Sequence, residues 1–150
     1  MKKSIIFRIT AIILSAAICF SLAACSLKFG IVENVKVELG DSERFSQQEL
    51  EDAVKSVKNY FKTDFGGCEL ISICYDEYFS DCEIEGYLNN GPGAYNGSTY
   101  ENTIVLYSDF ITHDPSYESG LEHNTDYEGW KWTLIRNKRG GSWRVDECGY

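Results

Sequence analysis

The sequence is short of positive charge, and it lacks the motifs that hold zinc. It has 14 Lys and Arg side chains against 23 Asp and Glu, together with 2 His. A nucleic-acid-binding surface needs Lys and Arg against the phosphates, so this balance excludes a nucleic acid as partner. There is no Cys-x-x-Cys pair and no cluster of Cys with His, so we expect neither a zinc site nor another bound cofactor.

The motifs of common catalytic and calcium sites are also missing. No Gly-x-Ser-x-Gly elbow occurs, and His113 and His123 fall in a polar stretch where we expect them to face solvent. An acidic run extends from Asp76 to Glu85, but its spacing does not match an EF-hand loop, which needs Gly at its sixth position. A solvated acidic face is the better interpretation of this run. We therefore assign no catalytic residue.

The amino terminus has the three parts that are typical of a secretory signal. It starts with Met1-Lys2-Lys3, continues through an apolar stretch from Ile9 to Phe20, and ends in Leu22-Ala23-Ala24-Cys25. The last four residues resemble the bacterial lipobox, in which a lipid is joined to the Cys thiol and cleavage just before it makes that Cys the new amino terminus. We predict a cleaved signal over residues 1–24 and lipid attachment at Cys25.

An uncleaved membrane helix and a plain secretory signal are the alternatives. A span needs about 20 apolar residues, but Arg8 shortens this stretch and no stop-transfer pattern follows it. Lys2 and Lys3 favour the cytoplasmic side in either case. We therefore expect the remainder of the chain on the outer face of the cell membrane.

The predicted mature chain is strongly acidic. Removing the signal takes away three of the 14 basic side chains, Lys2, Lys3 and Arg8, and no acidic one, which leaves 11 against 23 and a formal charge of −12. This charge disfavours docking onto anionic headgroups, so acyl chains must hold the protein at the membrane.

Four cysteines remain outside the cytoplasm: Cys68, Cys74, Cys82 and Cys148. They can pair in three ways or stay as free thiols. Only a bond between Cys68 and Cys74 is excluded, because about 20 Å of predicted strand separates them.

The clearest local signal is a helix. Ser46 and Glu49 form a capping box, and apolar residues recur on one face from Leu50 to Phe61 until Gly66 and Gly67 end the pattern. The spacing predicts one amphipathic helix from residue 46 to about residue 64. A helix of this length is only marginally stable in isolation, so its apolar face must pack against another element.

Alternation of apolar and polar residues predicts that this partner is a sheet. Strands are expected at residues 35–39, 69–75, 102–111, 127–136 and 143–150. The short Gly-containing segment 137–141 should join the last two as an antiparallel hairpin. Residues 76–88 fit either a second helix or a helical turn and loop. An N-terminal amphipathic helix packed on a curved antiparallel sheet is an α+β fold.

Residues spread over this helix and sheet also carry a family resemblance. They are Phe45, Ser46, Glu49, Tyr60, Phe61, Gly67, Cys68, Tyr75 to Glu77, Asn102 to Leu106, Ser108 to Phe110, Trp130 to Trp132, Arg136, Asn137, Gly141, Trp143, Gly149 and Tyr150. Together they resemble a family of lipoproteins of uncharacterised activity from low-GC Gram-positive bacteria. The resemblance implies a cone-shaped roll like that of nuclear transport factor 2, related to the cystatin-like folds. Such rolls host enzymes, ligand binders and dimerisation modules, so the fold does not settle the function.

The sequence thus predicts a signal (1–24), a lipidated tether (25–43) and an α+β roll domain (44–150). The tether would let the domain stand clear of the headgroups. Candidate residues for a pocket in the roll are Asp76, Tyr107, Trp130 and Trp132. Aromatic rings on a concave sheet can line a site for an apolar or sugar ligand, although they more often fill a core.

The function that we predict is a lipid-anchored binding or interaction module. Its partner would be a small apolar ligand, another protein or a second copy of the chain. A small hydrolase or isomerase that uses a carboxylate near Asp76 is one alternative. A purely structural surface lipoprotein is the other.

Overall fold

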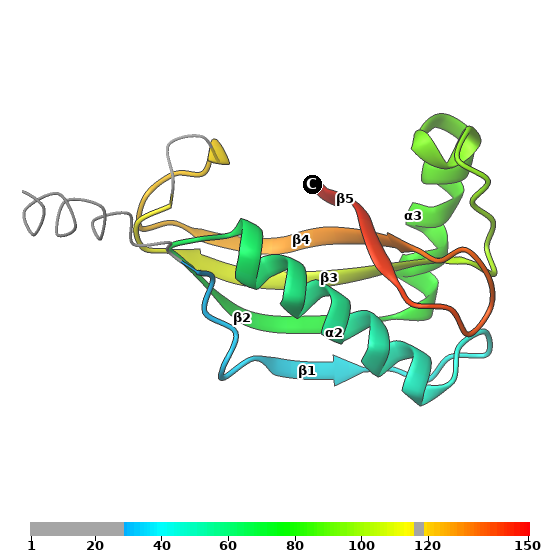
Figure 1. Cartoon of the computed structure of the whole chain (residues 1–150), viewed down its shortest axis with the longest axis horizontal. Coiled ribbons are helices and arrows are strands. Elements are labelled where there is room, and N and C mark those ends of the chain that lie inside the picture. Colours follow the sequence, from blue (N-terminus) through cyan, green and yellow to red (C-terminus); the bar gives the residue numbers. More distant parts are fainter. Residues whose placement is uncertain (1–28, 116–118) are drawn as a thin grey trace, which may run out of the picture.

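The structure is a computed structural model that describes residues 29–115 and 119–150. Within these ranges the chain forms an α+β domain whose elements are β1 (Lys36–Leu39), α2 (Gln47–Asp64), β2 (Cys68–Tyr75), α3 (Glu77–Asn90), a short 3-10 turn (Pro92–Ala94), β3 (Thr103–Thr112), β4 (Asp126–Ile135) and β5 (Arg144–Gly149). Figure 1 shows α2 lying across the sheet and α3 standing at one end of it. The predicted signal and Cys25 lie outside the described residues.

The five strands form one open sheet in the order β1-β2-β3-β4-β5. The prediction of an antiparallel sheet is wrong at one edge, because β1 pairs with β2 in parallel, with Lys36 opposite Ser72. The other three pairings are antiparallel. Between β1 and β2 the chain returns along the sheet as α2, so both strands run in the same direction. The sheet is therefore mixed.

The domain includes residues well before residue 44. The amide of Gly30 donates to Lys62 O at 3.0 Å, and Ile31 pairs with Glu69 in an isolated parallel bridge. Strand β1 follows a few residues later. Much of the segment predicted as a tether is therefore part of the domain.

The predicted capping box of α2 is confirmed. Ser46 Oγ accepts from the amide of Glu49, and the Glu49 carboxylate accepts from the amide of Ser46. The helix ends at Asp64, and the chain then turns at Gly67, where φ is 80° and a Cβ would lie 2.1 Å from Asp114 O. Only glycine fits a turn that is both left-handed and this close to another backbone.

The apolar face of α2 covers one face of the sheet, which we call the inner face. Its buried core includes Leu50, Val57, Phe61, Phe65, Leu70, Ile73, Leu106, Phe110, Trp132 and Leu134. Rings pack edge to face across the layer, with Phe61 and Phe110 centroids 5.6 Å apart. Side chains thus fill the space between helix and sheet.

Residues 76–88, which the sequence left open between helix and loop, belong to the helix α3. Asp76 is its N-cap and accepts from the amide of Phe79 at 3.1 Å. Ile84 and Tyr87 are buried, and Ser80 Oγ accepts from the amide of Val105 in β3 at 3.1 Å. The helix α3 therefore packs on the outer face of the sheet, opposite α2.

Candidate functional site

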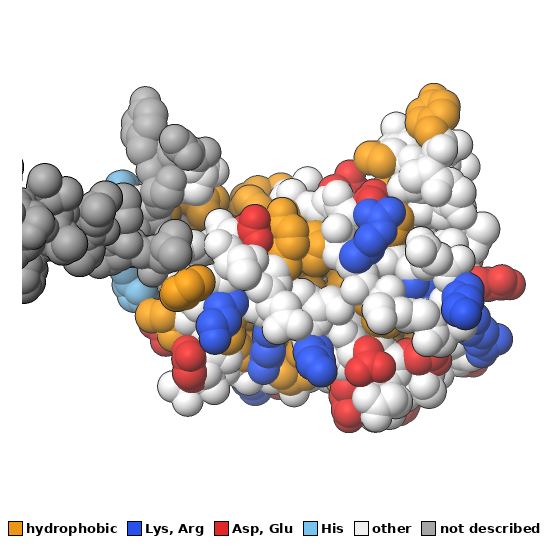
Figure 2. All heavy atoms as spheres, viewed as in Figure 1, with side chains coloured by type: hydrophobic (Ala, Val, Ile, Leu, Met, Phe, Trp, Pro, Cys, Tyr) orange, Lys and Arg blue, Asp and Glu red, His pale blue; other side chains and the backbone are white. Residues whose placement is uncertain are grey.

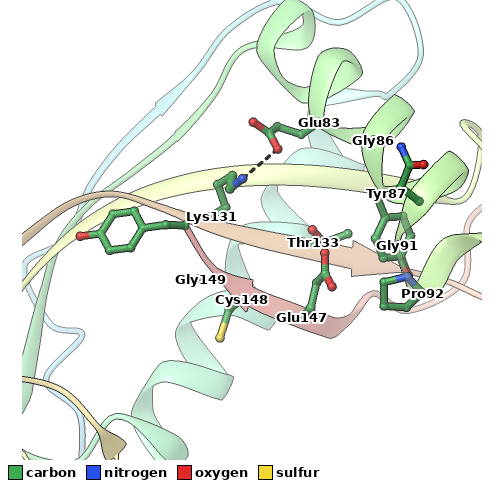
Figure 3. Close-up of a pocket in the computed structure, with 12 residues that line it drawn as sticks. Glu83, Gly86, Tyr87, Gly91, Pro92, Lys131, Thr133, Glu147, Cys148 and Gly149 are labelled. Atoms are coloured by element: carbon green, nitrogen blue, oxygen red, sulfur yellow. Dashed lines mark hydrogen bonds and ion pairs between the residues drawn. The ribbon is translucent and has the colours of Figure 1, made fainter.

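A polar pocket opens on the outer face, between α3 and the strands β4 and β5. Its volume is about 400 Å³, within the range of small-molecule sites. The residues that line it are Glu83, Gly86, Tyr87, Asn90, Gly91, Pro92, Lys131, Thr133, Glu147, Cys148, Gly149 and Tyr150. Figure 3 shows the charged side chains of α3, β4 and β5 converging on the same space. We call this space the α3 pocket.

An ion pair crosses the α3 pocket. Lys131 Nζ lies 2.9 Å from Glu83 Oε2, and both side chains are partly exposed. Lys131 is opposite Tyr107 in the β3–β4 register, which points both toward α3. Trp130 and Trp132 flank Lys131 in β4 and point the other way, because successive strand residues alternate faces. The fold therefore fixes the only lysine of β4 over Glu83.

A second carboxylate stands beside this pair. Glu147 of β5 lies opposite Thr133 of β4, and its carboxylate is directed toward Thr133 in Figure 3. Glu147 makes no ion pair with any residue of the described ranges. Since Glu83 already neutralises Lys131, the pocket carries one uncompensated negative charge from Glu147.

Tyr87 forms a firm wall of the pocket. Its hydroxyl donates to Asp146 Oδ2 at 2.5 Å and accepts from Asn96 Nδ2 at 2.7 Å. Burial raises the pKa of Tyr87, and the neighbouring Asp146 raises it further. Gly93 lies against the ring, where a Cβ would come within 2.5 Å of Tyr87 Cε1. The phenol is thus held protonated and in one orientation.

The arrangement suits binding better than catalysis. The pocket offers charged groups, an amide at Asn90, a hydroxyl at Thr133 and ring surfaces at Tyr87 and Pro92. Among the residues that the structure describes, no three His, Cys, Asp or Glu side chains are grouped as a metal site. Glu83 is partly exposed and Glu147 is exposed, so neither carboxylate lies in the enclosed, water-poor surroundings that suit a general base.

The four residues proposed from the sequence do not come together. Trp132 is fully buried on the inner face, where its indole N–H donates to Ser108 Oγ at 2.8 Å. Trp130 is on the same face, half-buried, with Phe65 and Phe110 around it. Asp76 and Tyr107 lie on the side of α3. The shared face of the two tryptophans is thus a filled core under α2 at Trp132 and a partly open edge at Trp130.

Asp76 and Tyr107 have clear local roles. Asp76 is exposed and caps α3. Burial raises the pKa of Tyr107 to about 12, with smaller contributions from the charges of Glu83, Cys74 and Cys82. Tyr107 therefore stays protonated beside the α3 pocket at physiological pH without being one of its lining residues.

No protein family, curated protein or solved structure matches this chain. The function therefore rests on the chemistry of the site itself. Within the described ranges no helix has the length and apolar character needed to cross a bilayer. Cys68, Cys74, Cys82 and Cys148 are all free thiols, which answers the question that the sequence left open.

The residues that make the α3 pocket were missed by sequence reasoning. Lys131 could have been found, since the Trp-Lys-Trp alternation in a strand places the lysine alone on the opposite face. Glu147 could not, because it depends on how β5 pairs with β4. Glu83 was noticed only as one member of an acidic run.

Proposed function

We propose that this chain is a lipid-anchored extracytoplasmic protein that binds a small, polar, positively charged ligand in the α3 pocket. The basic start, the apolar stretch and the lipobox-like Leu22-Ala23-Ala24-Cys25 support the anchor and the location on the outer face of the cell membrane. The single observation that supports the ligand class is the uncompensated carboxylate of Glu147 beside a neutralised Lys131–Glu83 pair.

The chemistry of the pocket favours an amine over a carboxylate. An ammonium group placed between Glu147 and Glu83 would make charge-assisted hydrogen bonds, whereas an anion would meet two carboxylates and one occupied lysine. Hydroxyl groups on the same ligand would find Asn90 and Thr133, and a flat apolar face would find Tyr87 and Pro92. The overall negative charge of the chain adds a weaker, long-range attraction for cations.

A matched pair of sugars tests this ligand class. D-glucosamine and D-glucose share a ring and differ by one amine, so we expect titration calorimetry to give about tenfold tighter binding of glucosamine. Glu147→Gln should remove most of this preference. Glu85→Gln is the matched control, because Glu85 is an exposed carboxylate of α3 that does not line the pocket. Equal or absent binding of both sugars at millimolar concentration would reject the proposed ligand class.

The anchor has an independent test. Cys25→Ala should abolish incorporation of labelled palmitate and leave the protein unprocessed or released from membranes. Mass spectrometry of the wild-type product should find a lipidated residue 25 at its amino terminus. An unmodified first residue, or a different start, would reject the anchor and leave the α3 pocket untouched.

The other functions predicted from the sequence gain less support. The enzyme alternative relied on a carboxylate near Asp76, but Asp76 and its neighbour Glu77 are both engaged in structure. Asp76 caps α3, and Glu77 accepts from Tyr75 Oη at 3.0 Å and from the amide of Glu43 at 3.0 Å. A small apolar ligand loses support because Trp132 and its neighbours fill the inner face. The likeness to the cone-shaped roll also stays a proposal, supported by one helix packed along one sheet face.

A further inference from the structure

One end of the domain combines the first described residues of the chain with exposed apolar side chains. Phe29 is 55% exposed and Ile31 is 42% exposed, although both flank a segment that is fixed to the domain by backbone hydrogen bonds. Figure 2 shows hydrophobic side chains at this end, where the described chain begins. We call Phe29, Ile31 and Lys62 the anchor end.

The stretch of chain between this end and the predicted lipid site is short. Only four residue steps separate Cys25 from Phe29. A fully extended chain covers at most about 3.6 Å per residue, so Phe29 can stand no more than about 14 Å from the lipidated thiol. Phe29 cannot move away from the domain without a cost in free energy, because the amide of Gly30 is hydrogen-bonded to Lys62 O and Gly30 lies against Phe61 and Phe65.

We infer that the anchor end rests directly on the lipid bilayer, with Phe29 and Ile31 in the boundary between headgroups and acyl chains. This inference rests on the proposed lipid anchor at Cys25. Aromatic and aliphatic side chains are stabilised at that depth by burial of their apolar surface. A domain held within about 14 Å of the membrane and exposing these side chains on that side has the bilayer as its nearest apolar surface.

We expect apolar contact, and not charge, to hold the anchor end on the bilayer, and we call this contact the seat. Lys62 and Asp64 carry opposite charges two residues apart in the last turn of α2, and the chain as a whole is acidic. Anionic lipid therefore gains nothing at this surface, and uncharged phosphatidylcholine is a sufficient partner.

With the anchor end on the bilayer, the α3 pocket would lie on the side of the domain that faces away from the membrane. The anchor end lies at the start of β2, whereas α3 follows the end of β2, so the two are at opposite ends of the sheet (Figure 1). The ten residues of β3 run between these ends and cover about 33 Å at the usual rise per residue. The pocket would then face the aqueous side, within reach of dissolved ligands.

Depth-dependent fluorescence quenching tests the seat. Phe29→Trp and Tyr78→Trp each add one tryptophan, at the anchor end and on α3, where Tyr78 is 73% exposed. The full-length lipidated proteins are reconstituted into phosphatidylcholine vesicles with and without a nitroxide-labelled acyl chain, and the wild-type signal is subtracted. We expect the tryptophan at position 29 to be quenched at least about twofold more than the one at position 78.

The controls separate failure of the seat from failure of the anchor. Mass spectrometry of the same samples establishes whether Cys25 carries lipid, and without that lipid both the anchor and the seat are rejected. Equal quenching at positions 29 and 78 in a lipidated protein rejects the seat alone. A ten-residue Gly/Ser insertion after Lys28 lengthens the connection, and it should reduce the quenching at position 29 toward that at position 78.

Discussion

Glu49 of α2 and Arg136, directly after β4, form an ion pair that joins the first turn of the helix to the sheet. The distance from Arg136 Nη1 to Glu49 Oε1 is 2.5 Å, and the Arg136 side chain is only 1% exposed. The guanidinium also lies 4.3 Å from the Trp143 ring centroid, and Trp143 Nε1 donates to Glu49 O at 3.0 Å. One carboxylate thus caps its own helix and compensates a buried cation.

Loss of the Glu49 charge should destabilise the domain. Glu49→Gln keeps the shape of the side chain but leaves Arg136 without its counter-ion, and we expect it to lower the free energy of unfolding by about 2 kcal/mol. Urea denaturation followed by circular dichroism measures this change. Glu51→Gln, an exposed position on the same helix, is the control and should be nearly neutral. Similar effects of the two variants would contradict the role of the pair.

The same carboxylate should make stability depend on acid pH. The Ser46 amide hydrogen bond, opposed by burial and aided by Arg136, lowers the pKa of Glu49 to about 2. A carboxyl with a lowered pKa in the folded state contributes its full stability above the unfolded value of about 4.3 and loses it as pH falls toward 2. The difference in unfolding free energy between wild type and Glu49→Gln should therefore shrink steadily from pH 5 to pH 2. A constant difference across that range would contradict the assignment.

The two tryptophans of β4 should differ sharply in how much they contribute to the free energy of unfolding. Trp132 is fully buried, so Trp132→Ala should cost about 3–5 kcal/mol and leave the Ser108 hydroxyl without its donor. Trp130 is half-buried at the edge of the same aromatic group, and Trp130→Ala should cost less than half as much. Thermal and urea denaturation of the two variants compare them directly. Equal losses would mean that Trp130 is as enclosed as Trp132.

A methyl group at residue 30 should detach the segment around Gly30 and Ile31 from α2 and β2. In Gly30→Ala the new Cβ would meet Phe61 O at 2.4 Å and Phe65 O at 3.0 Å, which the helix backbone cannot accommodate without movement. Hydrogen exchange should become faster at Ile31 and along β1, and much less so in β3 and β4. Gly86→Ala is the control, because its Cβ meets nothing within 4 Å and alanine favours the helix by up to about 1 kcal/mol. Unchanged exchange in Gly30→Ala would refute the close contact.

The four thiols should react in a definite order. Cys82 is exposed and should be modified first by a disulfide reagent at pH 8, with peptide mapping to identify it. Burial raises the pKa of Cys74 and of Cys148, and it raises the pKa of Cys68 to about 11, so less of each is present as the reactive thiolate. Cys68 should react only on unfolding. Early modification of Cys68 would contradict its burial.

Local signals explain which parts of the fold could be predicted. Ser46, Glu49 and the apolar stripe that follows specify α2 through interactions within a few residues, and the structure confirms them. Helix α3 lacks such a stripe: of its residues only Ser80, Ile84 and Tyr87 are buried, and one of these is polar. Its cap at Asp76 was hidden in what looked like a run of acidic surface residues.

Pairing between distant strands explains what the sequence could not show. The alternation of Val35, Val37 and Leu39 indicates a strand but carries no information on whether its neighbour runs parallel or antiparallel. The α3 pocket depends on the same kind of long-range information, because Lys131, Glu147 and Glu83 meet only through the pairing of β4 with β5 and the packing of α3. Trp130 and Trp132 point into the core on the inner face, whereas Lys131 between them lines the pocket on the outer face.

The hydrogen bond between Trp143 and Glu49 also means that the domain can complete its folding only late in synthesis. The first turn of α2 is synthesised 94 residues before the indole that binds it, and 87 before Arg136. Contacts between residues this far apart in the sequence form slowly, because closing the long loop between them costs conformational entropy. Until the segment from Trp143 to Cys148 has been synthesised, the polypeptide lacks the contacts that complete its core.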